Sequence, residues 1–476
     1  MEIKGIVIAG LAGGSGKSVA SVGLTAYLAR RGVNVVPFKK GPDYIDAGWM
    51  ALAAGRDCYN LDPYLMTEEA IWHSFCRHSR GADMVVVEGN RGLYDGVNAS
   101  GGYSTAELAV LLDLPVVLVV NCTKTTRTIA AMVLGCQVLD RRVRICGVIL
   151  NHVATKRQQK IITEAVTEVT GVPVLGVIPR MKRDIFPMRH LGMLPHQEYL
   201  GSDGAISYLA DIFENSVDVN GIERNMAPLS ALYGGEANMA GDERTVPSRA
   251  RKKTSGTGDE RLRIGVIQDA AFQFYYAENL EALQREGAEL ISVNALKDEK
   301  LPCLDGLYIG GGFPETSAGE LAANSSFRYS VLEAAKKGLP IYAECGGLIY
   351  LGQSIVIDGR EHELAGVFPV RFGMSKKPQA HGYSIFEVEL ENPYYARATQ
   401  IKGHEFRYST VLEWQGREED LVFGMTRGKG FMGGRDGLCY NNVLALYTHV
   451  HACGTPEWAA GFIGFCRQRK VQLQET

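Results

Sequence analysis

Short apolar runs alternate with helical patterns through residues 3 to 180, and this alternation limits the fold more than any other feature of the sequence. The runs rich in Val, Ile and Leu read KGIVIAG, NVVPFKK, DMVVVEG, PVVLVVN, ICGVILN and PVLGVIP. Helical patterns occupy residues 18–31, 68–80 and 125–139. Nearly continuous apolar strands are expected where helices cover both faces of a parallel sheet. The pattern therefore predicts an open, doubly wound α/β domain.

A second α/β domain follows a change in composition. Residues 214–260 are polar, carry Gly, Ser, Pro and clusters of charge, and have little periodicity, which is typical of an interdomain linker. Strand patterns then resume as RIGVIQD, GLYIGGG, PIYAEC, HGYSIFEVEL and NNVLALYTHVH. With 476 residues, the chain is longer than one ordinary core requires. We expect a first domain over residues 1–213, a linker over 214–260 and a second domain over 261–470.

Charge and hydropathy exclude several classes of protein. The net charge of -3 gives no broad attraction to nucleic acid or to an anionic membrane. No apolar stretch reaches the roughly 18 residues that a membrane span needs. The N-terminus resembles a buried strand more than a signal peptide. The ten scattered cysteines, with no C-x-x-C pair, fit a reducing compartment. We expect a cytoplasmic protein with no nucleic-acid or membrane partner.

A glycine-rich loop joins the first strand to the first helix. Backbone N–H groups of such a loop can wrap around phosphate oxygens. Lys17 would neutralise the β- and γ-phosphates of ATP, and the Ser18 hydroxyl would bind Mg²⁺. Leu11 stands at the usual first-glycine position, and this longer loop resembles the dethiobiotin synthetase branch of P-loop proteins. The alternative is a glycine turn that binds no nucleotide. The candidate loop glycines are Gly13, Gly14 and Gly16.

Acidic side chains follow two further strands. KKGPDYID comes after the second apolar run, and EGNRGLYDG begins where MVVV ends. A carboxylate at the end of a buried strand is how P-loop proteins hold Mg²⁺ opposite the phosphate loop. Each cluster alone could be a solvated turn, but together with the loop they predict one site at the ligand-binding edge of the sheet. The candidates for metal binding or carboxylate activation are Ser18, Asp43, Asp46, Glu88 and Asp95, and those for substrate binding in these runs are Lys40, Tyr44 and Arg91.

A cysteine between a short strand and a helix suggests thiol chemistry. The two glycines that follow Cys345 in the segment AECGG permit a sharp turn that exposes the thiol, and the following helix N-terminus favours its thiolate form. The backbone of Gly311 and Gly312 could form an oxyanion hole. YTHVH supplies a base, for which we favour His449 over His451. The alternative for the cysteine is a buried structural thiol.

The motifs GPDYID, EGNRGLYDG, GGGFPE, AECGGLIYLG, GHEFRYS and YTHVH occur in that order. Together they resemble the cobyrinic acid a,c-diamide synthase family over essentially the whole chain apart from the linker. The resemblance implies a dethiobiotin-synthetase-like ATP domain joined to a class I glutamine amidotransferase domain. It implies amidation of the a and c acetate side chains of a tetrapyrrole, in cobalamin biosynthesis, with glutamine and Mg-ATP. A homodimer is left open as the assembly.

The same resemblance implies residue roles. Cys345 would attack glutamine, and His449 would raise its nucleophilicity. Lys17 and Ser18 would serve ATP, and Asn151 matches a position that reads adenine in dethiobiotin synthetases. The four carboxylates of the two acidic clusters would serve the metal or the activation of the substrate.

Three departures from the usual motifs bear on these roles. His451 stands where ordinary amidotransferases have the acidic residue that orients the histidine, so His449 must be oriented otherwise. Arg91 and Arg407 replace other residues, and either could pair with substrate carboxylates or be a surface arginine. The ring could therefore also be sirohydrochlorin or sirohaem. The rival classes are an ammonia-using ligase with a decayed amidotransferase domain and a P-loop switch ATPase with a partner-binding domain.

Overall fold

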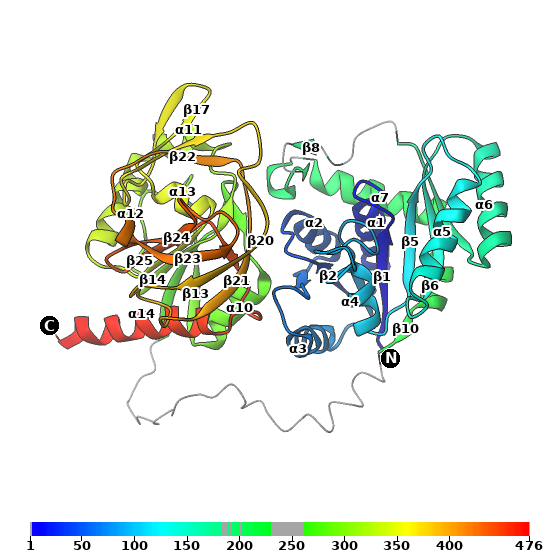
Figure 1. Cartoon of the computed structure of the whole chain (residues 1–476), viewed down its shortest axis with the longest axis horizontal. Helices are drawn as coiled ribbons and strands as arrows, with labels where there is room; N and C mark the ends of the chain where they lie inside the picture. Colours follow the sequence, from blue (N-terminus) through cyan, green and yellow to red (C-terminus); the bar gives the residue numbers. More distant parts are fainter. Residues whose placement is uncertain are drawn as a thin grey trace, which may run out of the picture. The chain divides into compact units, whose positions relative to one another are not determined.

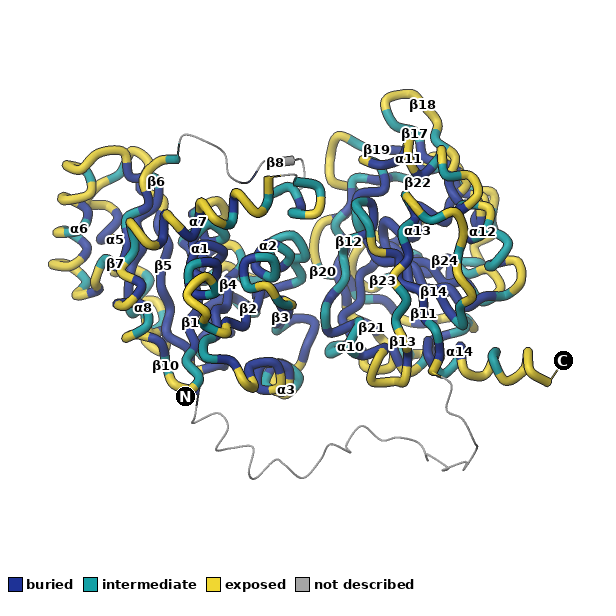
Figure 2. The backbone as a smooth tube through the Cα atoms, turned by 180° about the vertical axis from the view of Figure 1, so that it is seen from behind, coloured by how far each residue is buried: buried dark blue, intermediate teal, exposed yellow. Residues whose placement is uncertain are grey.

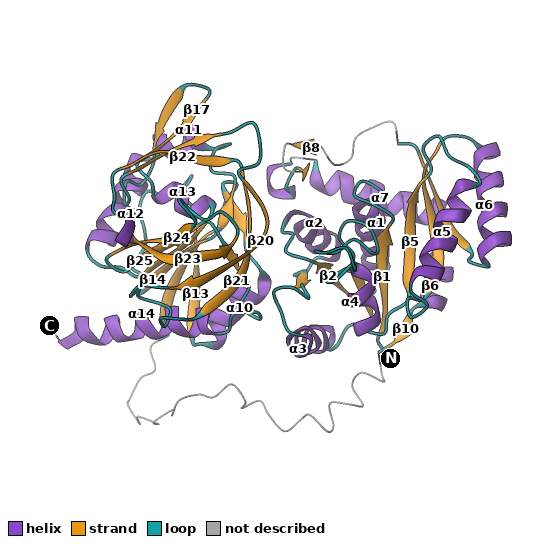
Figure 3. Ribbon diagram, in the orientation of Figure 1, coloured by secondary structure: helices purple, strands orange, loops and turns teal. Residues whose placement is uncertain are grey.

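Two structural units divide the chain in the computed structural model. It describes residues 2–181, 186, 188–189, 192–199, 201–229 and 261–475, with the first unit ending and the second beginning between 229 and 261. Each unit is built around its own sheet, with helices against it (Figure 1, Figure 3). Each therefore has its own core.

The sheet of the first unit is parallel except for one two-residue strand, β10, which pairs with the start of the central strand β1. Its order is β3-β2-β4-β1-β5-β6-β7, with β10 pairing antiparallel to β1. The bounds are β1 (Lys4–Gly10), β2 (Val35–Lys40), β3 (Tyr59–Leu61), β4 (Met84–Glu88), β5 (Val116–Asn121), β6 (Ile145–Val153), β7 (Val174–Pro179) and β10 (Ala227–Pro228). The strands β2, β4 and β1 are neighbours, so their carboxyl ends meet at one place on the sheet edge.

Helices cover both faces of this sheet. The chain runs one way along the sheet from β1 to β3 and then back, so right-handed connections put α1 and α2 on one face and α3 to α6 on the other. The helix α7 packs with α1, and their apolar residues share one core. Strands are buried, while α5 and α6 are exposed outward (Figure 2). The bounds are α1 (Lys17–Arg30), α2 (Ile45–Ala54), α3 (Glu68–Ser79), α4 (Thr105–Leu111), α5 (Thr128–Leu139), α6 (Lys156–Thr170), α7 (Ser202–Ser216) and α8 (Val219–Asn225), with a 3-10 turn at His196–Glu198 and a small hairpin of β8 (Met188–Arg189) and β9 (Gly192–Met193).

The main sheet of the second unit is mixed. Its order is β13-β11-β14-β16-β25-β24-β23-β20-β21-β26, parallel from β13 to β25 and antiparallel beyond. Only Tyr447 and Thr448 separate β25 from β26 in sequence, yet β26 pairs with β21 at the far end of this order. The antiparallel part must therefore curl back toward β25. The bounds are β11 (Leu262–Ile267), β13 (Ala288–Val293), β14 (Gly306–Ile309), β16 (Ile341–Glu344), β20 (Ala380–Val388), β21 (Gln400–Arg407), β23 (Leu421–Arg427), β24 (Arg435–Tyr440), β25 (Val443–Leu446) and β26 (His449–Val450).

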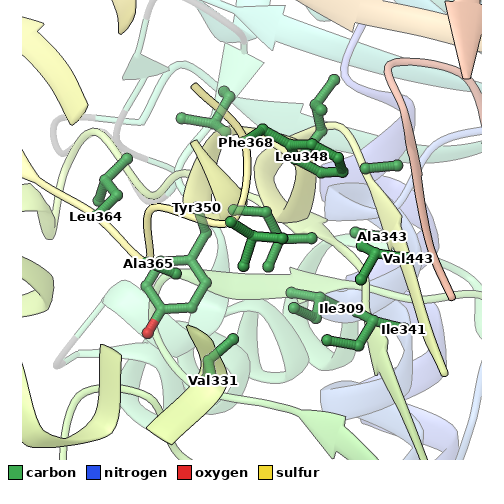
Figure 4. Close-up of a cluster of buried hydrophobic side chains, with 14 of the residues drawn as sticks. Ile309, Val331, Ile341, Ala343, Leu348, Tyr350, Leu364, Ala365, Phe368 and Val443 are labelled. Atoms are coloured by element: carbon green, nitrogen blue, oxygen red, sulfur yellow. The ribbon is translucent and has the colours of Figure 1, made fainter. Parts of the chain in front are cut away.

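Two hydrophobic cores lie on opposite faces of this sheet. Alternate strand residues pack with α10 (Ala277–Arg285) and α14 (Glu457–Glu475) on one face. The other face packs with α11 (Ala318–Ala323), α12 (Ser325–Lys336) and α13 (Gly346–Leu351), where Ile309, Ile341 and Leu348 meet (Figure 4). The remaining elements are β12 (Phe272–Phe274), β15 (Gly311–Gly312), β17 (Ser354–Ile357), β18 (Arg360–Glu363), β19 (Val370–Met374), β22 (Ser409–Trp414) and a 3-10 turn at Glu418–Asp420.

The predicted fold class is confirmed, since both units are α/β with helices on both sheet faces. The expected boundary at residue 213, however, falls inside α7, and residues up to 229 continue the first unit as α8 and β10. Residues 230–260 of the expected linker lie outside the described residues. No helix in the described part of the chain is long and apolar enough to cross a membrane.

Candidate active sites

The glycine loop of the first unit lies between β1 and α1, as the sequence predicts. Gly16 is the N-cap of α1 and has a φ of 99°, a backbone conformation that favours glycine. A Cβ built on Gly13 or on Gly14 would meet no atom within 4 Å, so the backbone of the loop is open on that side. Lys17 is largely buried, and its Nζ donates to the Ala12 carbonyl at 3.3 Å. The loop can therefore present N–H groups and an ammonium to an anion.

Oxygen atoms from three neighbouring segments gather beside this loop. The Ser18 hydroxyl lies 2.9 Å from Asp46 Oδ1 and 2.9 Å from Glu88 Oε1. One hydroxyl proton can serve only one of these acceptors at a time. Glu88 is fully buried, and its Oε2 has no hydrogen-bond partner among the described residues. The cluster thus holds more acceptors than donors, which is the condition a cation would relieve.

Lys39 partly balances these carboxylates and was not singled out from the sequence. Its buried Nζ lies 3.3 Å from Asp46 Oδ2 and 3.5 Å from Glu88 Oε1. Burial alone would lower its pKa, but the carboxylates of Glu88, Asp46 and Asp43 outweigh burial and raise it. Burial raises the pKa of Glu88 to about 7 even though Lys39 lowers it. The parallel pairing of β2 with β4 places Lys39 directly opposite Glu88.

The other predicted residues of the first unit border this cluster. Asp43 accepts a hydrogen bond from the Asp46 backbone at 2.9 Å, and burial together with Asp46 raises its pKa to about 6. Asp95 is exposed and accepts from Gly92 N at 2.8 Å, so it closes a turn while acting electrostatically on Lys17.

Lys40, Tyr44 and Arg91 were expected to bind substrate, and they lie at or just after the ends of β2 and β4. Lys40 is buried, which lowers its pKa, and the exposed Arg91 lowers it further. Arg91 adopts a φ of 50°. Tyr44 is the N-cap of α2.

Asn151 lies against the phosphate loop, and its expected role in reading adenine stays a prediction. The side chain is 1% exposed, and its Nδ2 donates to the Ser15 carbonyl at 3.0 Å. Its Oδ1 accepts from His152 N at 2.9 Å. A Cβ on Gly16 would come within 2.0 Å of Asn151 Nδ2. The amide therefore packs under the phosphate loop and supports it.

In the second unit, Cys345 sits at a strained turn between β16 and α13. Its φ is 46° and its ψ is -97°, as the predicted sharp turn requires. A Cβ on Gly347 would lie 2.4 Å from the Ile309 carbonyl, so only glycine fits there. A Cβ on Gly346 would lie 3.0 Å from Gly312 N, which shows how closely the Gly311–Gly312 turn approaches the cysteine turn.

His449 joins these glycines and the cysteine. A Cβ on Gly311 would come within 2.4 Å of its Cε1 atom, and the histidine hydrogen-bonds to Cys345. Its Nδ1 lies 3.2 Å from Oε2 of Glu344, a contact that the sequence analysis missed. Burial lowers the pKa of His449, but the interactions with Cys345 and Glu344 outweigh it and raise that pKa to about 10.

Arg407 is buried, so the expectation of a surface arginine is wrong, while a role in substrate binding stays a prediction. It is buried, and its two terminal nitrogens donate to the carbonyls of Ser409 at 2.6 Å and Gly430 at 2.7 Å. Its guanidinium lies 3.8 Å from the centre of the Tyr447 ring. These contacts fix the guanidinium within the second unit and give it a role in holding the fold.

Comparison with known proteins identifies both units. Residues 6–191 match the CobQ/CobB/MinD/ParA nucleotide binding domain, and residues 263–456 match the CobB/CobQ-like glutamine amidotransferase domain. A cobyrinate a,c-diamide synthase of Magnetococcus marinus is 40% identical, covering 96% of this chain and 95% of its own. This chain belongs to the cobyrinate a,c-diamide synthase family. The cobyrinate a,c-diamide synthase of Archaeoglobus fulgidus is also 40% identical, with 99% of each chain covered.

Membership of the cobyrinate a,c-diamide synthase family confirms the resemblance predicted from the sequence. It shows an ATP-dependent glutamine amidotransferase with an N-terminal nucleotide-binding domain and a C-terminal amidotransferase domain. The oxygen cluster around Ser18 lies inside the matched nucleotide-binding domain, and Cys345 and His449 lie inside the matched amidotransferase domain.

Proposed function

We propose that this chain converts the a and c acetate side chains of cobyrinate into carboxamides, using glutamine as the nitrogen donor and Mg-ATP. The observation that carries the proposal is the presence of a Cys345–His449 pair and a glycine-loop carboxylate cluster in one chain. Relatives named cobyrinate a,c-diamide synthase cover nearly all of it. A switch ATPase would have no use for the first of these two sites.

The second unit would release ammonia. The Cys345 thiolate attacks the side-chain amide carbon of glutamine while His449 transfers a proton to the departing nitrogen. Backbone N–H groups of Gly311 and Gly312 are the proposed donors to the oxyanion. Water then cleaves the thioester, and glutamate leaves. The strained backbone at Cys345 supports this role, because strain of this kind is costly and is kept where a side chain must be aimed.

The first unit would activate the acetate, because a carboxylate and ammonium do not condense favourably in water. Transfer of the γ-phosphoryl group to the acetate gives a mixed anhydride, from which ammonia displaces phosphate. Lys17 and the loop N–H groups hold the phosphates, and Lys39 keeps the neighbouring carboxylates in place. Asn151 supports the loop from below.

The oxygen cluster fits Mg²⁺. It offers a hydroxyl and carboxylates, the hard ligands that this ion prefers, and the buried Oε2 of Glu88 lacks a hydrogen bond within the described residues. No group of three or more His, Cys, Asp or Glu side chains that could hold a metal occurs in the described ranges. Ser18, Asp46 and Glu88 would hold it, and when bound it neutralises phosphate charge.

The ring is tested by offering cobyrinic acid and sirohydrochlorin side by side with glutamine and Mg-ATP. Mass spectrometry should show two acid-to-amide conversions on cobyrinic acid. Conversion of sirohydrochlorin alone would contradict the proposed ring but not the proposed chemistry. Formation of no amide on either ring, in protein that consumes ATP, would contradict both.

All ten cysteines are free, which supports the further proposal of a cytoplasmic enzyme.

A further inference from the structure

The glutaminase site lacks an acidic residue at the usual place, two positions after the histidine, where His451 stands. We propose that Glu344 is the positioning residue of this site, and that its carboxylate holds Nδ1–H of His449 so that Nε2 is directed to Cys345. The inference rests on the proposed function and adds a residue to it. The acidic partner would come from the position before the nucleophile instead of from the strand of the histidine.

The carboxylate of Glu344 is fixed on both of its oxygens. Glu344 ends β16 and is fully buried. Its Oε2 lies 3.2 Å from His449 Nδ1, and its Oε1 accepts from Val450 N at 3.3 Å. The Tyr308 hydroxyl donates to Oε2 at 3.5 Å. Since two of these partners are consecutive residues of β26, the carboxylate fixes both the ring of the histidine and the backbone that carries it.

The opposite edge of the imidazole faces the cysteine turn. A Cβ on Gly311 would lie 2.4 Å from Cε1 and 3.1 Å from Nε2 of His449, so this edge packs on the glycine turn beside Cys345. A carboxylate can only accept, so Nδ1 must carry the hydrogen when it bonds to Glu344. Nε2 is then the nitrogen that can take the proton of the thiol. The negative charge of Glu344 also stabilises the imidazolium that results.

The two other histidines near His449 cannot take the place of the negatively charged carboxylate of Glu344. His404 stacks on His449 with ring centroids 4.9 Å apart, and burial lowers its pKa well below the usual value, so it is neutral. His451 accepts from Cys453 N at its Nδ1, and burial lowers its pKa to about 3. Its Nε2 therefore carries hydrogen and lies 3.7 Å from Oε2 of Glu278. His404 has its own partner, because the Tyr276 hydroxyl is 3.3 Å from its Nδ1. Neither His404 nor His451 therefore carries a charge beside His449.

Glu344→Gln keeps the size of the side chain and removes its charge, and Glu278→Gln is the matched control. Glu278 is equally buried in the same unit and lies beside a histidine, but that histidine is His451. We expect Glu344→Gln to lower glutamine-dependent kcat by up to about 10⁴-fold, the loss seen when the aspartate of a serine-protease triad becomes an amide. The KM for glutamine and the ammonia-dependent rate should change little, and Glu278→Gln should keep its glutaminase rate.

A second readout follows the charge directly. Iodoacetamide alkylation of Cys345, followed by peptide mass spectrometry, reports how much thiolate is present at each pH. In Glu344→Gln the alkylation curve should move to higher pH, because the imidazolium beside the thiolate has lost its counter-charge. A residue that only maintains the fold would lower the amount of active enzyme without moving this curve.

The outcomes distinguish the role of Glu344 from the proposed glutaminase function. Equal glutamine-dependent kcat in Glu344→Gln and Glu278→Gln, an unmoved alkylation curve, or an equal loss of ammonia-dependent activity would each overturn the role of Glu344. Retention of glutamine-dependent activity in Cys345→Ala would overturn the proposed glutaminase function itself. Loss in Cys345→Ala with no loss in Glu344→Gln would overturn the present inference alone.

Discussion

The Oε2 atom of Glu344 lies 3.2 Å from Nδ1 of His449, and Glu344 is followed directly in the chain by Cys345. The carboxylate and the thiol are therefore neighbours along the backbone, while both reach the same histidine. One short segment, at the end of β16, can thus place two of the three groups that thiol catalysis requires.

Replacing Cys345 should separate the two half-reactions. We expect Cys345→Ala to lose glutamine-dependent amidation, because no thiolate remains to attack the amide, while added ammonium salt still supports amidation at the other unit. Product amide, measured by mass spectrometry with each nitrogen source, checks this. Cys303→Ala, at an exposed cysteine, is the control and should keep both activities. Failure of ammonia to rescue Cys345→Ala would contradict the division of labour.

His449, in β26, and His451, directly after that strand, should respond differently to substitution. His449→Gln should abolish glutamate release, since the proton acceptor for Cys345 is removed. His451→Gln should retain most of it, because burial keeps that imidazole neutral by lowering its pKa to about 3. Glutamate release is the measurement for both variants. A larger loss in His451→Gln than in His449→Gln would show that the base is misassigned.

Glu88 should make the first unit less stable as pH rises. Burial raises its pKa to about 7 in the folded chain, so the folded state holds a proton that the unfolded state loses near pH 4.5. The stability that this proton contributes is present below the ordinary pKa and is lost as pH rises through about 7, with a limit on the order of 3 kcal/mol.

Glu88→Gln removes this titration and should flatten the profile. The stability of the wild-type chain minus that of the variant should fall between about pH 4.5 and 7. Peptide-resolved hydrogen exchange in urea, read over the first unit, measures the difference. A difference that rises with pH over this range would mean that the pKa of Glu88 is depressed in the folded chain.

Arg407 should matter for stability and not for the ring. Arg407→Ala leaves the Ser409 and Gly430 carbonyls without their donors and removes the cation over Tyr447, which should cost about 2–4 kcal/mol of unfolding free energy. The KM for the ring acid should stay unchanged. Arg417→Ala, at an exposed arginine of the same unit, is the control for both urea unfolding and kinetics. A raised KM with unchanged stability would return Arg407 to the substrate site.

Local pattern was enough to predict the sheet of the first unit and the glycine loop. Apolar runs such as residues 84–88 are long, continuous and flanked by turns, so they form strands wherever helices can cover them. The short strand β3 was not expected, because three residues carry too little periodicity. The end of the first unit was set too early, although apolar residues on one face of α7 mark it as a packed helix.

Side-chain partners were harder to predict, since they depend on contacts between distant segments. Glu344 and His449 meet across 105 residues, and a motif search looks for the acidic partner near the histidine instead. Asn151 and Arg407 are polar residues at strand ends, where sequence alone does not tell a buried hydrogen-bonded group from a ligand contact. Only the topology of the sheets decides which way each side chain points.

The central claim is that both chemistries serve one product, and nitrogen transfer tests it most directly. Purified chain is given cobyrinic acid, Mg-ATP and glutamine labelled with nitrogen-15 at its side-chain amide. The proposed function predicts that the label appears in new carboxamides of the ring, with glutamate and ADP formed alongside. ATP consumption that is independent of both glutamine and the ring acid, with no label in the ring, would contradict it.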